Sequence, residues 1–312
     1  MKVSILMGIN RTCRESKLFR DPVECMKELH ELGYDAMDVP LDGIMNANYM
    51  LAGDDWQQQV ERLANEAAKL GVTFPQCHLP YTKGPGPETD PKFANPGHRE
   101  YFDECMRRSY LAASMLGVKY ATAHPLSDTA MLCDMEHQLK INREYYDSYV
   151  ELGIAHGVGT AFENMRCNSP QWTWPYRYGC HVDDLITLID SYNDSMVGAC
   201  WDTGHANAQK QNQRLSINRL GHRLRNLHIN DNDYGMRDEH LIPFLGTVDW
   251  EDFVEGLVDI NFQGVLNYEV GAFCNNTPRE LQKIMLRTVY DNAMLLKGMY
   301  DTARANRAGK EG

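Results

Sequence analysis

The sequence predicts a single α/β domain folded as a (β/α)8 TIM barrel, and three observations support this prediction. Short apolar runs alternate with longer helical patterns along the chain. Several helical patterns end on a glycine, at Gly33, Gly71, Gly117 and Gly157, and such a glycine supplies the left-handed C-cap before the next strand. Eight strand–helix units divide the 312 residues into about 39 residues each, the size that such a barrel requires.

The predicted strands are short and apolar without strict alternation, as expected for a parallel sheet that is buried on both faces. In chain order they are VSILMGI at 3–9, AMDVPL at 36–41, TFPQCHLP at 73–80, KYATAHP at 119–125, TAFEN at 160–164, VGACWDT at 197–203, RNLHIND at 225–231 and GVLNYEV at 264–270. The predicted helices lie at 22–32, 54–70, 98–116, 135–156, 181–193, 208–223, 249–261 and 278–300. We expect a catalytic barrel over 1–302 and a flexible C-terminal tail over 303–312.

Composition limits the classes of partner and compartment. The chain has 31 Lys and Arg against 43 Asp and Glu, a formal net charge of −12, and such a surface repels nucleic acid and anionic membranes. No apolar stretch approaches the roughly 18 residues of a membrane span. The cysteines are odd in number and contain no Cys-x-x-Cys pair, which favours a reducing compartment; they are Cys13, Cys25, Cys77, Cys105, Cys133, Cys167, Cys180, Cys200 and Cys274. We expect scattered structural cysteines in a cytoplasmic protein without a membrane partner.

From the third strand onward, the strand ends carry residues that bind metals or hydrogen-bond sugars, at the edge where barrel active sites lie. Glu163, Asp202 and Glu269 end the fifth, sixth and eighth strands, and His228 ends the seventh. A buried carboxylate is costly unless a cation compensates its charge. This oxygen-rich set predicts one divalent cation, Mn²⁺ in the first place, with Mg²⁺, Co²⁺ or Zn²⁺ as alternatives.

A second set of polar residues surrounds these four predicted ligands. It comprises His78 and His124 at the ends of the third and fourth strands, His205 after the sixth, and Asp238 and His240 in a later loop. Gly204 permits the turn that would point Asp202 and His205 at one site. Two interpretations stay open: these residues bind substrate hydroxyls, or they are ligands of further metal ions.

The motifs CHLPY, AHP, FEN, WDTGH, LHINDND, DEHLIPFLGTVDW and YEV, in this order, resemble the xylose-isomerase-like TIM barrel superfamily of sugar phosphate isomerases, ketose epimerases, inosose-handling enzymes and endonuclease IV-like repair enzymes. In the epimerase branch the resemblance implies one metal on Glu163, Asp202, His228 and Glu269, with the two glutamates as the proton-transfer pair. His205 would contact substrate. In the endonuclease branch it implies three zinc ions, with added ligands at His78, His124, His205, Asp238 and His240.

One departure from the epimerases and one loop bear on the substrate. The epimerases carry an arginine shortly after the seventh-strand histidine, whereas this chain has Tyr234 near that position and Arg237 displaced. After the fifth strand, Trp172 and Trp174 lie close to Tyr176 and Tyr178, and such an aromatic cluster is suited to stacking on a sugar face. We therefore expect Trp172 and Trp174 to bind substrate, with loop or intersubunit packing as the alternative.

These observations predict a divalent-metal-dependent sugar or polyol isomerase or epimerase of carbohydrate metabolism. It would remove a proton next to a carbonyl through a metal-stabilised enediolate, with Glu163 and Glu269 as catalytic residues. The alternatives are a lyase on the same scaffold, either an inosose dehydratase or a C-glycoside-cleaving barrel subunit, and an endonuclease IV-like nuclease for abasic sites. The acidic charge makes nucleic acid the less favoured partner. We expect a homo-oligomer, with a hetero-subunit as the alternative.

Overall fold

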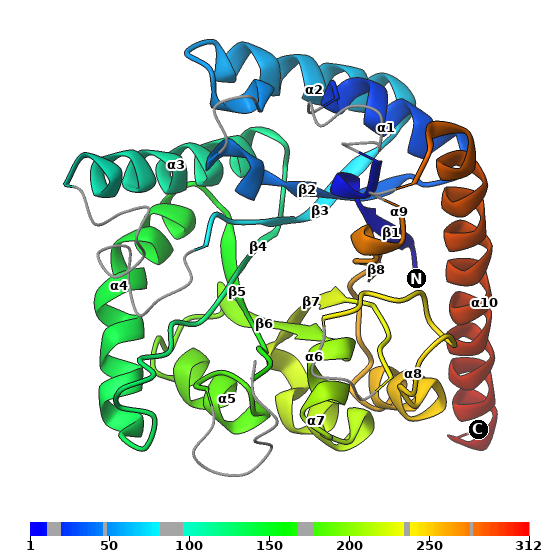
Figure 1. Cartoon of the computed structure of the whole chain (residues 1–312). Helices are drawn as coiled ribbons and strands as arrows, with labels where there is room; N and C mark the ends of the chain where they lie inside the picture. The colour runs from blue at the N-terminus through cyan, green and yellow to red at the C-terminus, as the bar shows by residue number, and fades with distance from the viewer. Residues whose placement is uncertain are drawn as a thin grey trace.

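The computed structural model describes residues 1–10, 20–45, 49–81, 96–167, 177–233, 238–274 and 277–311, and it confirms the (β/α)8 barrel (Figure 1). Eight strands form one parallel sheet over these described residues, and each overlaps a predicted range. They are β1 (Val3–Leu6), β2 (Ala36–Pro40), β3 (Thr73–His78), β4 (Tyr120–Ala123), β5 (Gly159–Glu163), β6 (Val197–Asp202), β7 (Leu224–His228) and β8 (Leu266–Tyr268).

The sheet closes on itself between its last two strands. Each strand from β1 to β6 pairs with its successor in the sequence, and β1 also pairs with β8. The ring is completed by a bridge between Ile229 and Tyr268, in which Ile229 N–H donates to Asn267 O at 2.8 Å and Glu269 N–H donates to Ile229 O at 3.0 Å. Closure brings the carboxyl ends of β5 to β8 to one rim of the barrel.

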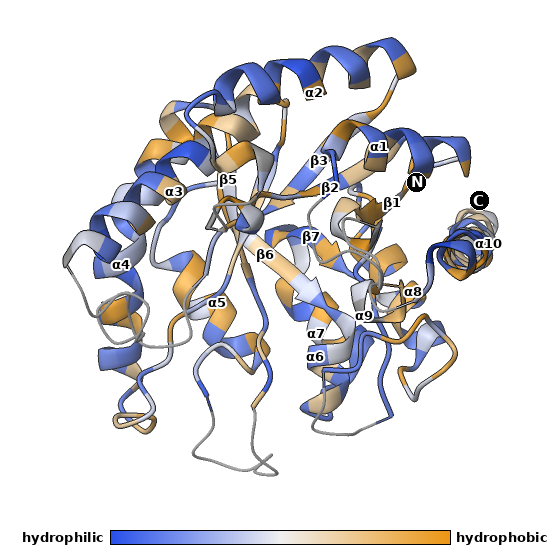
Figure 2. Ribbon diagram, turned by 45° about the horizontal axis from the view of Figure 1, so that its top comes forward, coloured by the Kyte–Doolittle hydropathy of each residue, from blue (hydrophilic) through white to orange (hydrophobic). Residues whose placement is uncertain are grey.

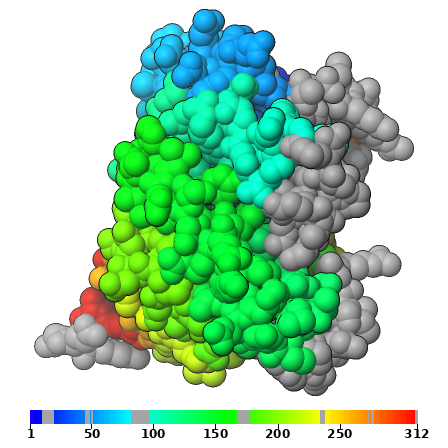
Figure 3. Space-filling model, turned by 90° about the vertical axis from the view of Figure 1, so that its left-hand side faces the viewer, coloured from blue at the N-terminus to red at the C-terminus, as the bar shows by residue number. Residues whose placement is uncertain are grey.

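The helices surround the strands as an outer ring (Figure 1). They are α1 (Pro22–Glu31), α2 (Trp56–Leu70), α3 (Pro96–Met115), α4 (Met135–Ala155), α5 (Val182–Asp190), α6 (Thr203–Ala208), α7 (Gln213–Leu220), α8 (Trp250–Asp259), α9 (Gly271–Cys274) and α10 (Arg279–Glu311), with short 3₁₀ helices η1 (Met7–Asn10), η2 (Leu41–Met45), η3 (Met50–Ala52) and η5 (Gly221–Arg223). On the α3 and α4 side, side chains form a continuous outer surface (Figure 3). Over the described residues, none of the helices combines the length and hydropathy needed to cross a bilayer.

Amphipathic spacing orients the helices on the barrel. In α2 the buried residues Trp56, Val60, Leu63 and Ala67 recur at helical spacing, and the ribbon accordingly alternates between blue and orange (Figure 2). This stripe packs into the core, while the polar positions between its members face outward. The predicted glycine caps are also present, with φ of 114° at Gly33, 73° at Gly71 and Gly117, and 74° at Gly157.

Two helix predictions need correction. The helix predicted at 208–223 is shorter, because α7 begins at Gln213 and ends at Leu220, and the unpredicted helix α6 precedes it directly after β6. The Asp202 side chain accepts the His205 N–H at 2.6 Å, and this N-cap starts a helix as soon as the strand ends. The segment predicted as a C-terminal tail from residue 303 is helical, because α10 continues to Glu311. The segment ARANRAGKE is rich in Ala, Arg, Lys and Glu, which are strong helix formers.

Candidate metal centre and substrate site

Four side chains meet at the rim where β5 to β8 end. Glu163, Asp202 and His228 are the last residues of β5, β6 and β7, and Glu269 directly follows β8. Their ligand atoms all lie within 4.8 Å of one another. The register pairs Asp202 with His228, so neighbouring strands deliver these two residues side by side. The structure thus brings together the four residues that the sequence predicts as the metal set.

The contacts inside this group are those expected of a cation site. His228 Nδ1 lies 3.0 Å from Glu163 Oε1 and 2.9 Å from Glu269 Oε2. A ring nitrogen carries at most one hydrogen, so it can satisfy only one of these carboxylates. Asp202 adds a third carboxylate, which is 0% exposed. Two buried carboxylates and one half-buried carboxylate beside one imidazole fit a hard divalent cation, whose charge would offset the cost of removing them from water.

Burial and neighbouring charges set the protonation of these groups. Burial raises the pKa of the Glu163 carboxyl, but the charge of His228 and the hydrogen bonds to it outweigh burial and hold that pKa well below its usual range. The same opposition lowers the pKa of Glu269 to about 2. Burial raises the pKa of Asp202 to about 6 despite the opposing charge of His205. All three groups are therefore mainly carboxylates at neutral pH.

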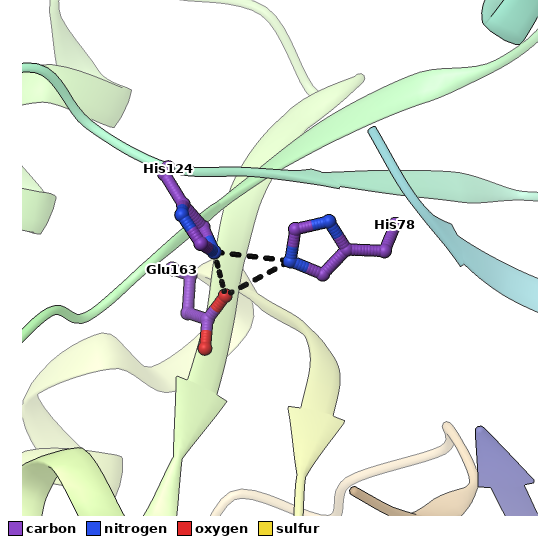
Figure 4. Close-up of side chains that lie close together, drawn as sticks. All are labelled: His78, His124 and Glu163. Carbon is purple, nitrogen blue, oxygen red and sulfur yellow. Dashed lines mark hydrogen bonds and ion pairs between the residues drawn. The ribbon is translucent and has the colours of Figure 1, made fainter. Parts of the chain in front are cut away.

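A second group shares Glu163 with the first. His78 Nε2 lies 3.0 Å from His124 Nε2, and the two nitrogens lie 3.7 and 3.1 Å from Glu163 Oε2 (Figure 4). His78 Nδ1 lies 2.8 Å from the Leu79 carbonyl oxygen, so the Nδ1 proton is held by the backbone and Nε2 faces the group. Glu163 therefore presents one oxygen to His228 and the other to the histidine pair.

A third group is built around Asp238. Its Oδ1 lies 3.4 Å from His205 Nε2 and 3.1 Å from His240 Nε2. The Nδ1 atoms of both histidines donate to backbone carbonyls, His205 to Asn164 O at 2.8 Å and His240 to Glu269 O at 2.7 Å. His240 is held at a φ of 47°, a conformation that costs a non-glycine residue energy. Metal-binding histidines are commonly oriented by such bonds from their other nitrogen.

Sequence reasoning missed an arginine of this group. Arg166 Nε lies 3.5 Å from Asp238 Oδ2, whereas the two histidines contact the other oxygen of that carboxylate. Arg166 follows the FEN motif by two positions. A basic side chain so close to a strand end is the signal in the sequence that indicates a rim residue. An arginine at this rim offers hydrogen bonds to substrate oxygens, so it belongs with the candidate substrate contacts.

Asp38 is the second missed residue, and it lies on the far side of His228. Its Oδ2 lies 3.6 Å from His228 Nε2, an electrostatic contact rather than a regular hydrogen bond. Gln76 Nε2 and Asn267 Nδ2 donate to the same oxygen at 2.8 and 3.0 Å, and Ser4 Oγ donates to Asn267 Oδ1 at 2.8 Å. The signal in the sequence is an aspartate inside the otherwise apolar strand AMDVP.

Removing the charge of Asp38 should weaken cation binding without removing a ligand. We expect Asp38→Asn to lower the affinity for Mn²⁺ by roughly 10–100-fold, the usual cost of losing an outer partner of a ligating histidine. Competition with a chromophoric chelator would measure this affinity. The control is Asp54→Asn, which removes the same charge at an exposed position and should bind like wild type. Wild-type affinity in Asp38→Asn would contradict the role.

Several predicted substrate residues lie outside the described part of the chain. Trp172 and Trp174 fall in 168–176, and Tyr234 and Arg237 fall in 234–237. Tyr178 is the described member of the aromatic cluster, and it is 2% exposed with its hydroxyl donating to Asp184 O at 3.3 Å. Its ring therefore packs into the core and does not face substrate.

The fold and the buried cluster define a class: a (β/α)8 TIM barrel with a His/Glu/Asp group at its rim that resembles a metal site. The chain belongs to the xylose isomerase-like TIM barrel family, whose model matches residues 26–287. This match confirms the resemblance inferred from the strand-end motifs. It covers the strands from β2 to β8 and therefore all four candidate ligands.

Several of the proteins to which this chain is similar carry the name of a sugar epimerase. The D-psicose 3-epimerase of Enterocloster bolteae is 30% identical over 82 residues, a stretch that spans 26% of this chain and 25% of that protein's length. A D-tagatose 3-epimerase-like protein has a TM-score of 0.72 at 18% identity, covering 98% of this chain and 99% of its own. The IOLI protein, whose structure holds a zinc atom, has a TM-score of 0.68 at 18% identity over 97% of this chain and 99% of its own. At these identities the structural likeness establishes the fold.

Proposed function

We propose that this protein is a divalent-metal-dependent isomerase or epimerase that acts on a ketose or a related sugar or polyol. One observation carries the proposal: Glu163 and Glu269 come from strands separated by β6 and β7, yet both reach His228 Nδ1, at 3.0 and 2.9 Å. Two carboxylates that flank one centre can remove a proton and return it from different directions. The epimerase relatives support this choice of reaction class.

The four rim residues would have two roles, cation binding and proton transfer. A divalent cation held by Glu163, Asp202, His228 and Glu269 would supply Lewis-acid stabilisation of the negative charge that develops on the substrate oxygens. One of the two glutamates takes the proton from the carbon next to the carbonyl, and the other delivers a proton to the resulting enediolate. Return to the opposite face of the same carbon is epimerisation, and return to the adjacent carbon is isomerisation.

The second and third groups would bind the substrate hydroxyls. His78, His124, His205 and His240 turn their Nε2 atoms toward the shared carboxylates of Glu163 and Asp238, and imidazole and carboxylate both hydrogen-bond sugar hydroxyls. These residues would fix which carbon lies beside the two glutamates. Positioning of this kind is a large part of the rate gain in enzymes.

Exchange with solvent deuterium tests the proposal without assuming the product. The protein is incubated with Mn²⁺ in D₂O with a panel of ketoses and keto-glycosides, and the recovered sugars are examined by NMR and mass spectrometry. We expect deuterium at the carbon next to the carbonyl for at least one sugar, and none with chelator-treated protein. Loss of a leaving group instead would identify the lyase. No exchange with any sugar would overturn the proposal.

A second candidate function is suggested by how the candidate metal ligands are grouped. They are nine in number: the four-residue set, His78, His124, His205, Asp238 and His240. The three clusters, namely the four-residue set, the His78–His124–Glu163 set and the set around Asp238, match the ligand grouping that the resemblance to endonuclease IV implies. The net charge of −12 opposes binding to a polyanion. Incubation with an abasic duplex and Zn²⁺ separates the two candidates, and we expect the duplex to stay intact.

Cation binding should release protons at neutral pH. Burial lowers the pKa of the His228 imidazolium, but the electrostatic interactions with Cys200, Glu269 and Glu163 outweigh burial and raise that pKa well above its usual value. The ring is therefore protonated at pH 7 and must lose a proton before Nδ1 can bind a cation. Affinity for Mn²⁺ should rise by roughly tenfold per pH unit for each proton released. Calorimetry in two buffers of different ionisation enthalpy measures the proton count, and equal heats would contradict the expectation.

A further inference from the structure

Two buried cysteines meet outside the candidate metal centre. Cys167 Sγ and Cys180 Sγ lie 3.6 Å apart, and with Met165 they form a small buried cluster separate from the main core. These two cysteines are therefore an exception to the expected scatter of the cysteines over the chain. The two positions are 13 residues apart, so the sequence contains no Cys-x-x-Cys signal for them.

The backbone around the pair is held by hydrogen bonds on both sides. Met165 N–H donates to Gly179 O at 2.7 Å. Gly179 N–H donates to Asp184 Oδ2 at 3.0 Å, and Gln211 Nε2 donates to Cys180 O at 2.8 Å. These bonds keep the two cysteines opposite each other. Disulfide formation requires the two sulfur atoms to move from 3.6 Å apart to a bond length of about 2.05 Å.

The two sulfur atoms differ chemically. Cys167 Sγ accepts the backbone N–H of Arg177 at 3.2 Å and lies within hydrogen-bond distance of the Cys180 thiol. The hydrogen bond from Cys180 lowers the pKa of Cys167 to about 6, against the effect of burial. Burial instead raises the pKa of Cys180 well above its usual value. One cysteine is thus a thiolate at neutral pH, and its neighbour keeps its proton.

The other described cysteines do not share this environment. Burial raises the pKa of the thiols of Cys25, Cys77, Cys105, Cys200 and Cys274. Cys133 is exposed, and Cys13 lies outside the described residues. A thiolate with a second thiol within reach is the arrangement found at redox-active cysteines.

We propose that Cys167 and Cys180 form a dithiol site that a hydroperoxide oxidises to a disulfide. The Cys167 thiolate attacks one peroxide oxygen, the O–O bond breaks, and the departing hydroxide leaves as water after protonation. The Cys180 sulfur then attacks the oxidised Cys167 sulfur, the S–O bond breaks, and the hydroxyl group leaves with the Cys180 proton as a second water. Two thiols and one hydrogen peroxide become one disulfide and two waters.

The test uses the reduced full-length protein, treated with a chelator so that bound metal cannot catalyse oxidation. After a stoichiometric dose of hydrogen peroxide, we expect the intact mass to fall by two hydrogen atoms and peptide mapping to find the Cys167–Cys180 link. Cys133→Ser is the matched control and should react like wild type. A link between other cysteines, or oxidation of Cys133 with no loss of two hydrogens, would overturn the proposal.

A second variant assigns the roles of the two sulfurs. In Cys180→Ser the oxidised Cys167 cannot be resolved, so a 1,3-diketone reagent should label Cys167, and Cys167→Ser should show no such label at Cys180. The rate of peroxide consumption at Cys167 should change by less than about twofold between pH 7 and 9, whereas free cysteine becomes more than about tenfold faster. A free-cysteine pH profile in the folded protein would refute the assignment of Cys167 as the thiolate. If a buried variant fails to fold, the wild-type link and its pH profile still decide.

Discussion

Glu269→Gln is expected to lose about 10²–10⁴-fold in turnover, the usual contribution of a positioned proton-transfer group. The glutamine keeps the shape of the side chain but cannot accept a proton. The fold should survive, because the backbone of Glu269 is held on both sides: its N–H donates to Ile229 O at 3.0 Å, and its carbonyl accepts from His240 Nδ1 at 2.7 Å. Its side chain is 16% exposed, against 1% for that of Glu163, so it is the glutamate more open to substrate.

Steady-state kinetics on the sugar found by deuterium exchange would measure this loss. Circular dichroism and metal content are recorded alongside, since an unfolded variant would say nothing about proton transfer. Glu251→Gln removes the same charge at an exposed position of α8 and should keep the wild-type rate. A wild-type rate in Glu269→Gln would remove Glu269 from the proposed mechanism.

Glu163→Gln is expected to have the broader effect, because Glu163 serves two groups at once. Its Oε1 lies 3.0 Å from His228 Nδ1 and its Oε2 lies 3.1 Å from His124 Nε2. The variant loses a candidate metal ligand. It also leaves the imidazoles of His78 and His124 without the carboxylate that they share. We expect Mn²⁺ affinity to fall by more than the roughly 100-fold seen on losing an outer partner, and turnover to fall below detection.

Metal analysis after dialysis, together with chelator competition, measures the affinity of Glu163→Gln. Glu151→Gln is its control, at an exposed position of α4. Comparison with Glu269→Gln separates the two roles: a variant that binds the cation but does not turn over has lost proton transfer, and one that binds no cation has lost the centre. Undiminished Mn²⁺ binding in Glu163→Gln would contradict the proposed ligand set.

Much of the fold and of the candidate site follows from the sequence alone. Apolar runs and the glycine caps between them locate all eight strands. A parallel barrel then requires the last residues of β5 to β8 to share one rim, which places Glu163, Asp202 and His228, with Glu269 just beyond β8, at that rim. This inference needs only chain order, since the topology fixes which strand ends are neighbours.

The pairing of side chains across the barrel was decided by the tertiary structure. Asp38 lies on β2, yet it contacts His228 on β7, because the interior of a closed barrel brings distant strands face to face. The same is true of Arg166 and Asp238, and of Cys167 and Cys180, which meet only after the chain has left β5 and returned toward α5. Periodicity and composition report which way a residue faces, whereas contacts between non-neighbouring elements depend on register, loop path and side-chain rotamers. Those quantities arise from packing of the whole chain. This is why the four residues of the candidate site could be predicted to share one rim, while their supporting partners and the cysteine pair could not.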